Sequence, residues 1–313
     1  MAEATYLEEE SFVNVTATAA LVAGQVVQLV DGRCGYYNGL ATAAIGDTVS
    51  IQIKGKVTIA KVASFVLLDG DEAWFTVANN NVTGELAGDL YAGVVVGDTA
   101  AADTTAVIDL NVKPTYKIDM TTGWDLSTVL TSGTPTMTDD AGIFRATMSA
   151  TAEAQICVAI SRDSVAIDTN CVAVFHIDVV DDGDAAALDV NIGMANGSHA
   201  TDADSITESV FVHLDGNVVN ILLESDDGTT EVAAADSTID YVLGTAFEVK
   251  MDFRNPADVQ IYINGVLALG GTTFNVDAAT GPWLALVHLE KTSDNTTADV
   301  QAKAKVRQSA ANF

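Results

Sequence analysis

Short segments rich in β-branched residues, separated by tight-turn sequences, fill the first 113 residues and constrain the fold of this chain most strongly. The strand-like segments are VVQLV (26–30), TVSIQIKGKVTIAK (48–61), AWFTV (73–77), YAGVVVG (91–97) and TTAVIDLNV (104–112). Between them lie Asp31-Gly32, Gly46-Asp47, Asp69-Gly70-Asp71, Thr83-Gly84 and Gly97-Asp98. Val and Thr suit a pleated sheet surface, whereas Gly and Asp favour turns. We therefore predict a small β-barrel over residues 1–113, with little internal room for an active site.

After Pro114 the expected strands become longer and more widely spaced. They cover residues 142–150, 154–162, 171–180, 188–195, 209–216, 218–225, 230–235, 247–254, 259–265, 283–291 and 298–308. The clearest alternates apolar Phe247, Val249, Met251 and Phe253 with polar residues, as in a strand that has one buried face. No amphipathic helical segment competes. The prediction is an all-β chain, with a two-sheet jelly-roll sandwich over residues 114–313.

The net charge limits the partners. With 43 acidic and 14 basic residues the chain carries −29. Residues 1–113 hold 14 acidic and 5 basic residues, so −9, and the remainder holds 29 and 9, so −20. Both halves repel phosphate, which argues against nucleic-acid binding, and a high net charge favours solubility.

Targeting signals and cysteine usage indicate folding in a cytoplasm. There is no apolar run of 18 residues, and the acidic start MAEATYLEEESF does not resemble a signal peptide, so no membrane partner is predicted. Three cysteines are too few for a disulfide framework. Cys157 and Cys171 face each other across a hairpin in one interpretation and are small buried thiols in the other, favoured one.

Motifs for chemistry are sparse. His176, His199, His213 and His288 are scattered, without the spacing of a zinc site, and neither a phosphate-binding loop nor a GxSxG elbow is present. The acidic run Asp178, Asp181, Asp182 and Asp184 offers oxygen ligands for a hard cation but lacks the EF-hand order, so a solvated turn is the favoured interpretation. We predict no catalytic residue, metal or cofactor.

Residues 4–113 resemble a known family. An N-terminal Tyr-x-Glu-Glu arm is followed by AGQVVQLV, AAIGDTVSIQIKGKVTIAK, and YAGVVVGD with TTAVIDL. This order is similar to a small β-barrel family encoded in bacteriophage head-gene clusters and associated with capsid decoration. Gly24, Gly46, Gly55 and Gly93 match its turn positions, and Gly97 ends the same strand. The resemblance carries over no catalytic residue.

Residues 115–310 show a fainter resemblance to concanavalin-like jelly rolls, which include laminin-G-like modules, lectins and laminarinase-type glycosidases. It rests on FEVKMDFRNPADVQIYINGVLAL and GPWLALVHLEKTSDNTTADVQAKAKVRQ. Those glycosidases use an ExDxxE strand with paired carboxylates. The nearest run, HIDVVDD (176–182), lacks both glutamates, so the resemblance implies the fold and argues against an enzyme.

The two resemblances together predict a phage capsid decoration protein that binds the major capsid protein at subunit junctions, clusters as a homotrimer and resides on the outer surface of the virion. The expected docking residues form the N-terminal arm: Thr5, Tyr6, Leu7, Glu8, Glu9, Glu10, Ser11 and Phe12. A frayed terminus is the alternative for this arm. The alternative function is a carbohydrate-binding or adhesive module for host-surface glycans, with Trp124 and Trp283 as stacking residues unless they serve in packing.

Overall fold

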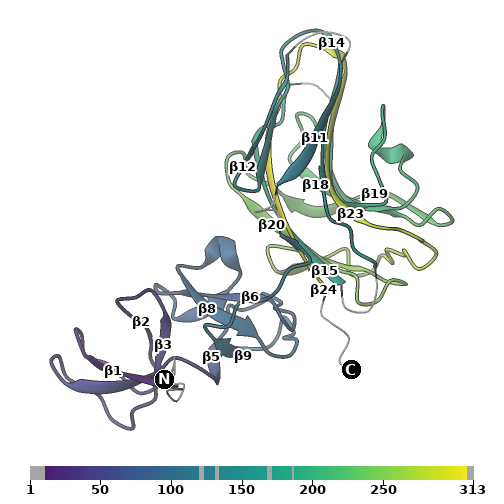
Figure 1. Ribbon diagram of the computed structural model, residues 1–313. Helices are drawn as coiled ribbons and strands as arrows, with labels where there is room; N and C mark the ends of the chain where they lie inside the picture. Colours follow the sequence, from purple (N-terminus) through teal and green to yellow (C-terminus); the bar gives the residue numbers. More distant parts are fainter. Residues whose placement is uncertain (1–10, 120–122, 131–133, 168–170, 185–186, 309–313) are drawn as a thin grey trace, which may run out of the picture. The chain divides into compact units, whose positions relative to one another are not determined.

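The computed structural model describes residues 11–119, 123–130, 134–167, 171–184 and 187–308, and its strands form antiparallel sheets throughout (Figure 1). Backbone contacts divide the chain into two compact units, Met1–Pro114 and Thr115–Phe313. The described residues contain strands and short 3₁₀ turns but no α-helix, which confirms the predicted all-β class.

The first unit contains two sheets, coloured purple to blue in Figure 1. The four-stranded sheet has the order β1 (Phe12–Thr16), β4 (Thr48–Gln52), β3 (Cys34–Tyr37) and β2 (Val26–Gln28). The five-stranded sheet has the order β5 (Lys56–Ala60), β9 (Thr105–Leu110), β8 (Leu90–Val95), β6 (Glu72–Thr76) and β7 (Asn81–Thr83), with the turn η1 (Glu85–Ala87) after β7. Two small apolar cores lie in this unit, one around Ile51 and the other around Ile108, and Cys34 of the four-stranded sheet belongs to the second.

Gly55 explains why two sheets form where the sequence suggests one continuous segment at 48–61. Its φ of +86° turns the chain between β4 and β5, which enter different sheets. The other glycines matched to the family also have positive φ, but Gly93 lies inside β8 rather than in a turn. A Cβ on Gly93 would lie 2.0 Å from the carbonyl oxygen of Asp109 on β9, so only glycine fits that position.

The second unit is a sandwich of an eight-stranded and a seven-stranded sheet. The eight-stranded sheet has the order β12 (Thr136–Asp140), β13 (Ile143–Thr147), β24 (Asp299–Gln308), β15 (Cys171–Asp181), β20 (Phe247–Asp252), β21 (Gln260–Ile263) and β22 (Val266–Ala268), with β10 (Ile118–Asp119) also paired to β24. The seven-stranded sheet has the order β11 (Trp124–Leu130), β14 (Glu153–Ser161), β23 (Leu284–Asp294), β16 (Leu188–Ala195), β17 (Ser209–Asp215), β18 (Asn220–Asp226) and β19 (Glu231–Asp240).

One large apolar core fills the space between these two sheets. Phe247, Val249 and Met251 enter it from β20, as their alternation predicts, and Val212 and Val287 enter it from the opposite sheet. The other face of β20 is also buried, where Glu248 lies 3.4 Å from the His176 ring on β15. The seven-stranded sheet likewise has a partly covered outer face, because the segment 196–208, which includes the turn η3 (Ala203–Ser205), packs Ala203 and Ile206 onto it.

Candidate functional site

The docking residues expected in the N-terminal arm are only partly described. Thr5, Tyr6, Leu7, Glu8, Glu9 and Glu10 lie outside the described residues. Ser11 and Phe12 are described, and Phe12 opens β1 with 45% of its surface exposed. Within the described part of the chain β1 pairs with β4 alone, so its second edge offers backbone groups to another strand.

Four further apolar side chains stand out from the connections of the four-stranded sheet. Val22, Val30, Leu40 and Ile45 are all exposed, and Val30 and Leu40 reach 109% and 104% of their reference surface. Val30 lies between β2 and β3, whereas Leu40 lies between β3 and β4. Fully exposed aliphatic side chains gain nothing from folding, so this part of the unit has apolar surface available to a partner.

The two tryptophans considered as sugar-stacking residues are buried. Trp124 packs against Phe144 at a centroid distance of 6.1 Å and donates its indole N–H to the carbonyl oxygen of Gly142. Trp283 packs against Phe253 at 6.0 Å. Both side chains are almost fully buried because the sandwich uses these large rings to fill its core, which leaves little ring surface for stacking on a sugar.

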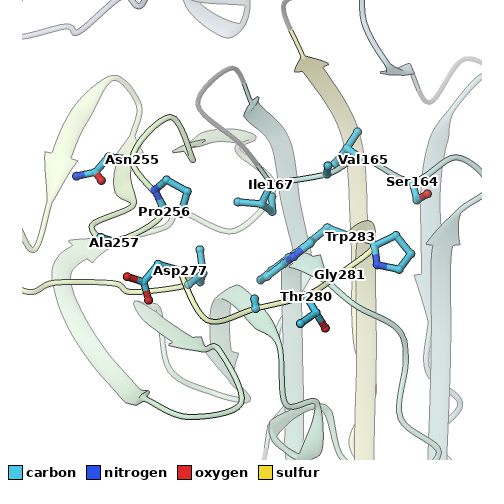
Figure 2. Close-up of a pocket in the computed structure, with 14 residues that line it drawn as sticks. Ser164, Val165, Ile167, Asn255, Pro256, Ala257, Asp277, Thr280, Gly281 and Trp283 are labelled. Carbon is cyan, nitrogen blue, oxygen red and sulfur yellow. The ribbon is translucent and has the colours of Figure 1, made fainter. Parts of the chain in front are cut away.

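A pocket of about 550 Å³ lies in the second unit, where three loops meet beside the Trp283 ring (Figure 2). Its lining includes Ser164, Asn255, Asp277 and Thr280. Asp277 is the one ionisable side chain among the described lining residues. Such a lining offers hydrogen bonds to a polar ligand but lacks the paired acid and base of a hydrolase.

The acidic run at 178–184 does not assemble into a cation site. Asp181 accepts hydrogen bonds from the Gly183 N–H at 3.0 Å and the Thr297 hydroxyl at 2.8 Å, while Asp182 accepts one from the Tyr241 hydroxyl at 3.1 Å. Among the described residues, neither Asp178 nor Asp184 belongs to a cluster of three potential metal ligands whose atoms lie within 4.8 Å of one another. The carboxylates of Asp181 and Asp182 secure a turn.

The three cysteines are free and buried. Cys157 lies on β14 and Cys171 on β15, so they belong to opposite sheets rather than to one hairpin. Burial raises the pKa of the Cys157 thiol to about 11 and that of Cys34 to about 12, which keeps both protonated and unreactive at neutral pH.

Sequence reasoning missed a group of polar side chains on the outer face of the seven-stranded sheet. Across β17, β16 and β23 the register places His213, Asn191 and His288 side by side. One step further along the same face, Asp215, Asp189 and Glu290 form a second row. Adjacent strands bring such residues close together because side chains on one face alternate with a period of two. We call these six residues the polar rows.

Two polar contacts join the polar rows to the segment 196–208. Glu290 accepts a hydrogen bond from the Ala203 N–H at 3.2 Å, and the His288 Nε2 lies 3.1 Å from the carbonyl oxygen of His199. The segment also brings Asp204 to 3.7 Å from the Nδ1 atom of His213. A loop and three strands thus converge on one face.

Acidic side chains cluster around the ring of His213. Its Nε2 lies 3.3 Å from Asp215 and 3.6 Å from Asp189, and its Nδ1 lies 3.5 Å from Glu224 on β18. Burial opposes the charged ring, yet these carboxylates outweigh burial and raise the pKa of His213 to about 10. Burial and neighbouring carboxylates raise the pKa of Asp189 to about 7.

Glu290 and His288 lie beside this centre. Burial, together with the neighbouring Asp189, raises the pKa of Glu290 to about 8. Burial lowers the pKa of His288, so that its ring is neutral. In the polar rows the carboxyl groups of Asp189, Asp215 and Glu290 therefore outnumber the single charged ring, that of His213.

The sequence contains a weak signal for this group. Each of three apolar strands carries one i, i+2 polar pair: Asp189 with Asn191, His213 with Asp215, and His288 with Glu290. The pairs are far apart in the chain and their spacing follows no motif, so only the strand register reveals that they meet.

Comparison with known proteins gives a match for the first unit. Residues 8–110 match the family model described as phage cement protein. The match contains β1 and ends with the last residue of β9, so it spans both sheets of the first unit. No curated protein matches the chain.

Solved structures with similarity to the chain include carbohydrate-active and carbohydrate-binding proteins. An alginate lyase of polysaccharide lyase family 7 is 17% identical, covers 58% of this chain and 85% of its own, and has a TM-score of 0.38. The Emp47p carbohydrate recognition domain is 9% identical, with 59% and 89% covered and a TM-score of 0.41. The carbohydrate-binding module CBM66 of Bacillus subtilis is 10% identical, with 57% and 94% covered and a TM-score of 0.35. Among the described residues no helix has the length and apolar character needed to span a membrane.

Proposed function

We propose that this chain is a capsid decoration protein of a bacteriophage, which binds the outer surface of the shell and stabilises it. The observation that carries the proposal is the match of residues 8–110 to the phage cement protein family. Residues 1–113 are the capsid-binding part and residues 114–313 the sandwich that the virion displays. The role is structural, because many modest contacts on a symmetric lattice add interface area and multiply into high avidity.

Two features of the four-stranded sheet support this role. Val30 and Leu40 are apolar, fully exposed and close to the turns of the sheet. The edge of β1 can accept a strand of the major capsid protein, and the preceding arm with Glu8, Glu9 and Glu10 suits a basic groove. We infer that the arm and the exposed apolar side chains dock together.

Co-sedimentation tests the proposal. The full-length protein is mixed with capsids assembled from the major capsid protein encoded beside it, and we expect saturable binding. Val30→Asp and Leu40→Asp should weaken it at least about tenfold, since each places a charge in an apolar contact. Val242→Asp is the matched control, because Val242 is a valine of the second unit with 65% of its surface exposed. Absence of binding, or equal weakening by all three variants, would refute the assignment.

The arm is tested separately. Deleting residues 1–10 should slow capsid binding at low salt without unfolding the first unit, because charges at an interface rim act mainly on the association rate. The effect should diminish as salt rises. Equal binding by the truncated and full-length proteins at both salt concentrations would show that the arm is a loose end.

The oligomeric state on the shell is a homotrimer in this proposal. A three-fold cluster closes its interfaces and covers strand edges within the cluster. Averaged electron-microscopy density should show the protein at local three-fold positions of the virion. Isolated monomers away from symmetry axes would contradict this arrangement.

Carbohydrate binding by the sandwich is the second candidate function, and the pocket beside Trp283 is the observation that favours it. Its hydroxyl, amide and carboxylate groups suit the hydroxyls of a host-surface glycan. A glycan array probed with the full-length protein should give a signal that Asn255→Ala weakens. A signal that Asn255→Ala leaves intact would place glycan binding elsewhere, and a blank array would count against the function.

A further inference from the structure

The polar rows and the adjoining Glu224 contain a concentration of buried polar atoms that have no hydrogen-bond partner. Of the eight such side-chain atoms among the described residues, three lie in the polar rows, namely Asn191 Oδ1, His213 Nδ1 and His288 Nδ1, and a fourth is Glu224 Oε1 on β18. His213 is only 7% exposed, and Asn191 and His288 are fully buried. Buried polar atoms in folded proteins nearly always have a hydrogen-bond partner, so four without one in one place indicate that a ligand belongs there.

The geometry around His213 identifies the kind of ligand. One ligand atom from each of Asp189, Asp204 and His213 lies within 4.8 Å of the other two. Asp204 lies 3.7 Å from the Nδ1 atom of the ring, whereas Asp189 lies 3.6 Å from its Nε2 atom. Two ligands bound tetrahedrally at 2.0–2.1 Å from one ion are about 3.4 Å apart, so Asp204 and Nδ1 are already close to the spacing of a bound pair, and Asp189 must rotate from Nε2 toward Nδ1 to join them.

The second nitrogen of His213 is already occupied as a metal-binding histidine requires. Its Nε2 lies 3.3 Å from the Oδ1 atom of Asp215 and is positioned to donate to it. Once an ion displaces the proton from Nδ1, the ring keeps its proton on Nε2, and the lone pair of Nδ1, the atom without a hydrogen-bond partner, is directed toward Asp204 and Glu224. Metal-bound histidines characteristically donate the other ring N–H to a carboxylate in this way.

From these observations we propose that the outer face of the seven-stranded sheet binds one divalent first-row transition-metal ion, of the Mn²⁺ or Zn²⁺ class, through His213 Nδ1, Asp189 and Asp204. A nitrogen ligand with two carboxylates suits these ions better than Ca²⁺ or Mg²⁺, which prefer sets of oxygen ligands. The ion takes the place of the proton on Nδ1 and offsets the negative charge of Asp215 and Glu224. Because Asp204 is half exposed, the ion is reachable from solvent and retains positions for water.

Titration calorimetry of the full-length protein tests the site. After chelator treatment and dialysis, Mn²⁺ and Zn²⁺ should each bind with a stoichiometry of one, and Ca²⁺ and Mg²⁺ much more weakly. His213→Gln and Asp204→Asn should weaken Mn²⁺ binding by about tenfold or more, and Asp215→Asn by about tenfold through loss of the orienting hydrogen bond. His176→Gln is the matched control, since His176 is another part-buried strand histidine beside a glutamate.

Electron spin-echo spectroscopy of bound Mn²⁺ provides a second readout. The wild type should show coupling to a histidine nitrogen, which His213→Gln removes and His176→Gln retains. Asp204→Asn is safe for folding because its side chain is half exposed, and circular dichroism checks each variant. The proposal is overturned if the wild type binds neither ion, if Ca²⁺ binds more tightly than Mn²⁺, or if folded Asp204→Asn and His213→Gln bind as the wild type does. Each result is independent of capsid binding.

Discussion

The side chain of Asn111 holds the backbone of Cys34 on both sides, although the two residues are 77 positions apart. Its Oδ1 accepts from the Cys34 N–H at 2.9 Å, and its Nδ2 donates to the carbonyl oxygens of Cys34 and Ile53, both at 2.8 Å. Cys34 belongs to the four-stranded sheet, and Asn111 directly follows β9 of the five-stranded sheet. One amide thus links the two sheets of the first unit.

Replacing Asn111 should loosen that link. Asn111 has a φ of +58°, a backbone conformation that Asn and Gly accept more readily than Ala. Asn111→Gly therefore removes the three hydrogen bonds with little backbone strain and should lower the free energy of unfolding by about 3 kcal/mol, at about 1 kcal/mol per bond. Asn111→Ala should cost more. Calorimetric unfolding of the full-length protein measures this, and a Gly variant as stable as the wild type would show that the link is unimportant.

Gly93 and Gly97 form a matched pair for a second prediction. Both have positive φ, but a Cβ on Gly93 would lie 2.0 Å from the Asp109 carbonyl oxygen, whereas Gly97 has open space around it. Gly97→Ala should cost about 1 kcal/mol from backbone strain alone. Gly93→Ala should cost more than about 2 kcal/mol, because β8 and β9 must also separate. Chemical denaturation compares the two, and equal losses would contradict the close approach.

Glu208 provides a prediction of pH dependence. Its carboxylate accepts from the N–H and hydroxyl of Thr280 at 3.0 and 2.9 Å and from the Gly281 N–H at 2.8 Å, which ties the segment 196–208 to the loop before β23. Burial favours the neutral acid, but these hydrogen bonds outweigh burial and lower the pKa of Glu208.

A lowered pKa in the folded state means that the stabilisation is complete above the unfolded pKa of about 4.3 and is lost as the pH falls through the folded value. Glu208→Gln should therefore lower the free energy of unfolding by about 2 kcal/mol at pH 7 and by progressively less below pH 4. Thermal unfolding across this range measures the difference. Glu231→Gln, at an exposed site on β19, is the control, and a pH-independent loss for Glu208→Gln would contradict this explanation.

The sequence was sufficient for the fold class because alternation and turn residues report local backbone preference. The face with Phe247, Val249 and Met251 is buried in the core as the pattern predicts. The division of residues 48–61 between two sheets was not predictable from propensity, since strand-forming residues flank Gly55 on both sides. The polar rows escaped detection for a different reason, because their members meet only through the register of β16, β17 and β23. A periodic pattern identifies a strand but does not identify its neighbours.

If the ion proposed at His213 is bound, it should also restrain the segment 196–208, because Asp204 comes from that segment while Asp189 and His213 come from the sheet. We take the ion to bind only while the segment 196–208 is packed on the sheet. At a free Zn²⁺ concentration one hundred times the dissociation constant, binding then stabilises the packed segment against local opening by about 2.7 kcal/mol. Amide hydrogen exchange in residues 196–208 should slow accordingly when Zn²⁺ saturates the full-length protein. Asp204→Asn should abolish the slowing, and exchange in the loop 64–71 of the first unit should stay unchanged as an internal control. Slowing that persists in Asp204→Asn would mean that Asp204 does not couple the segment to the ion.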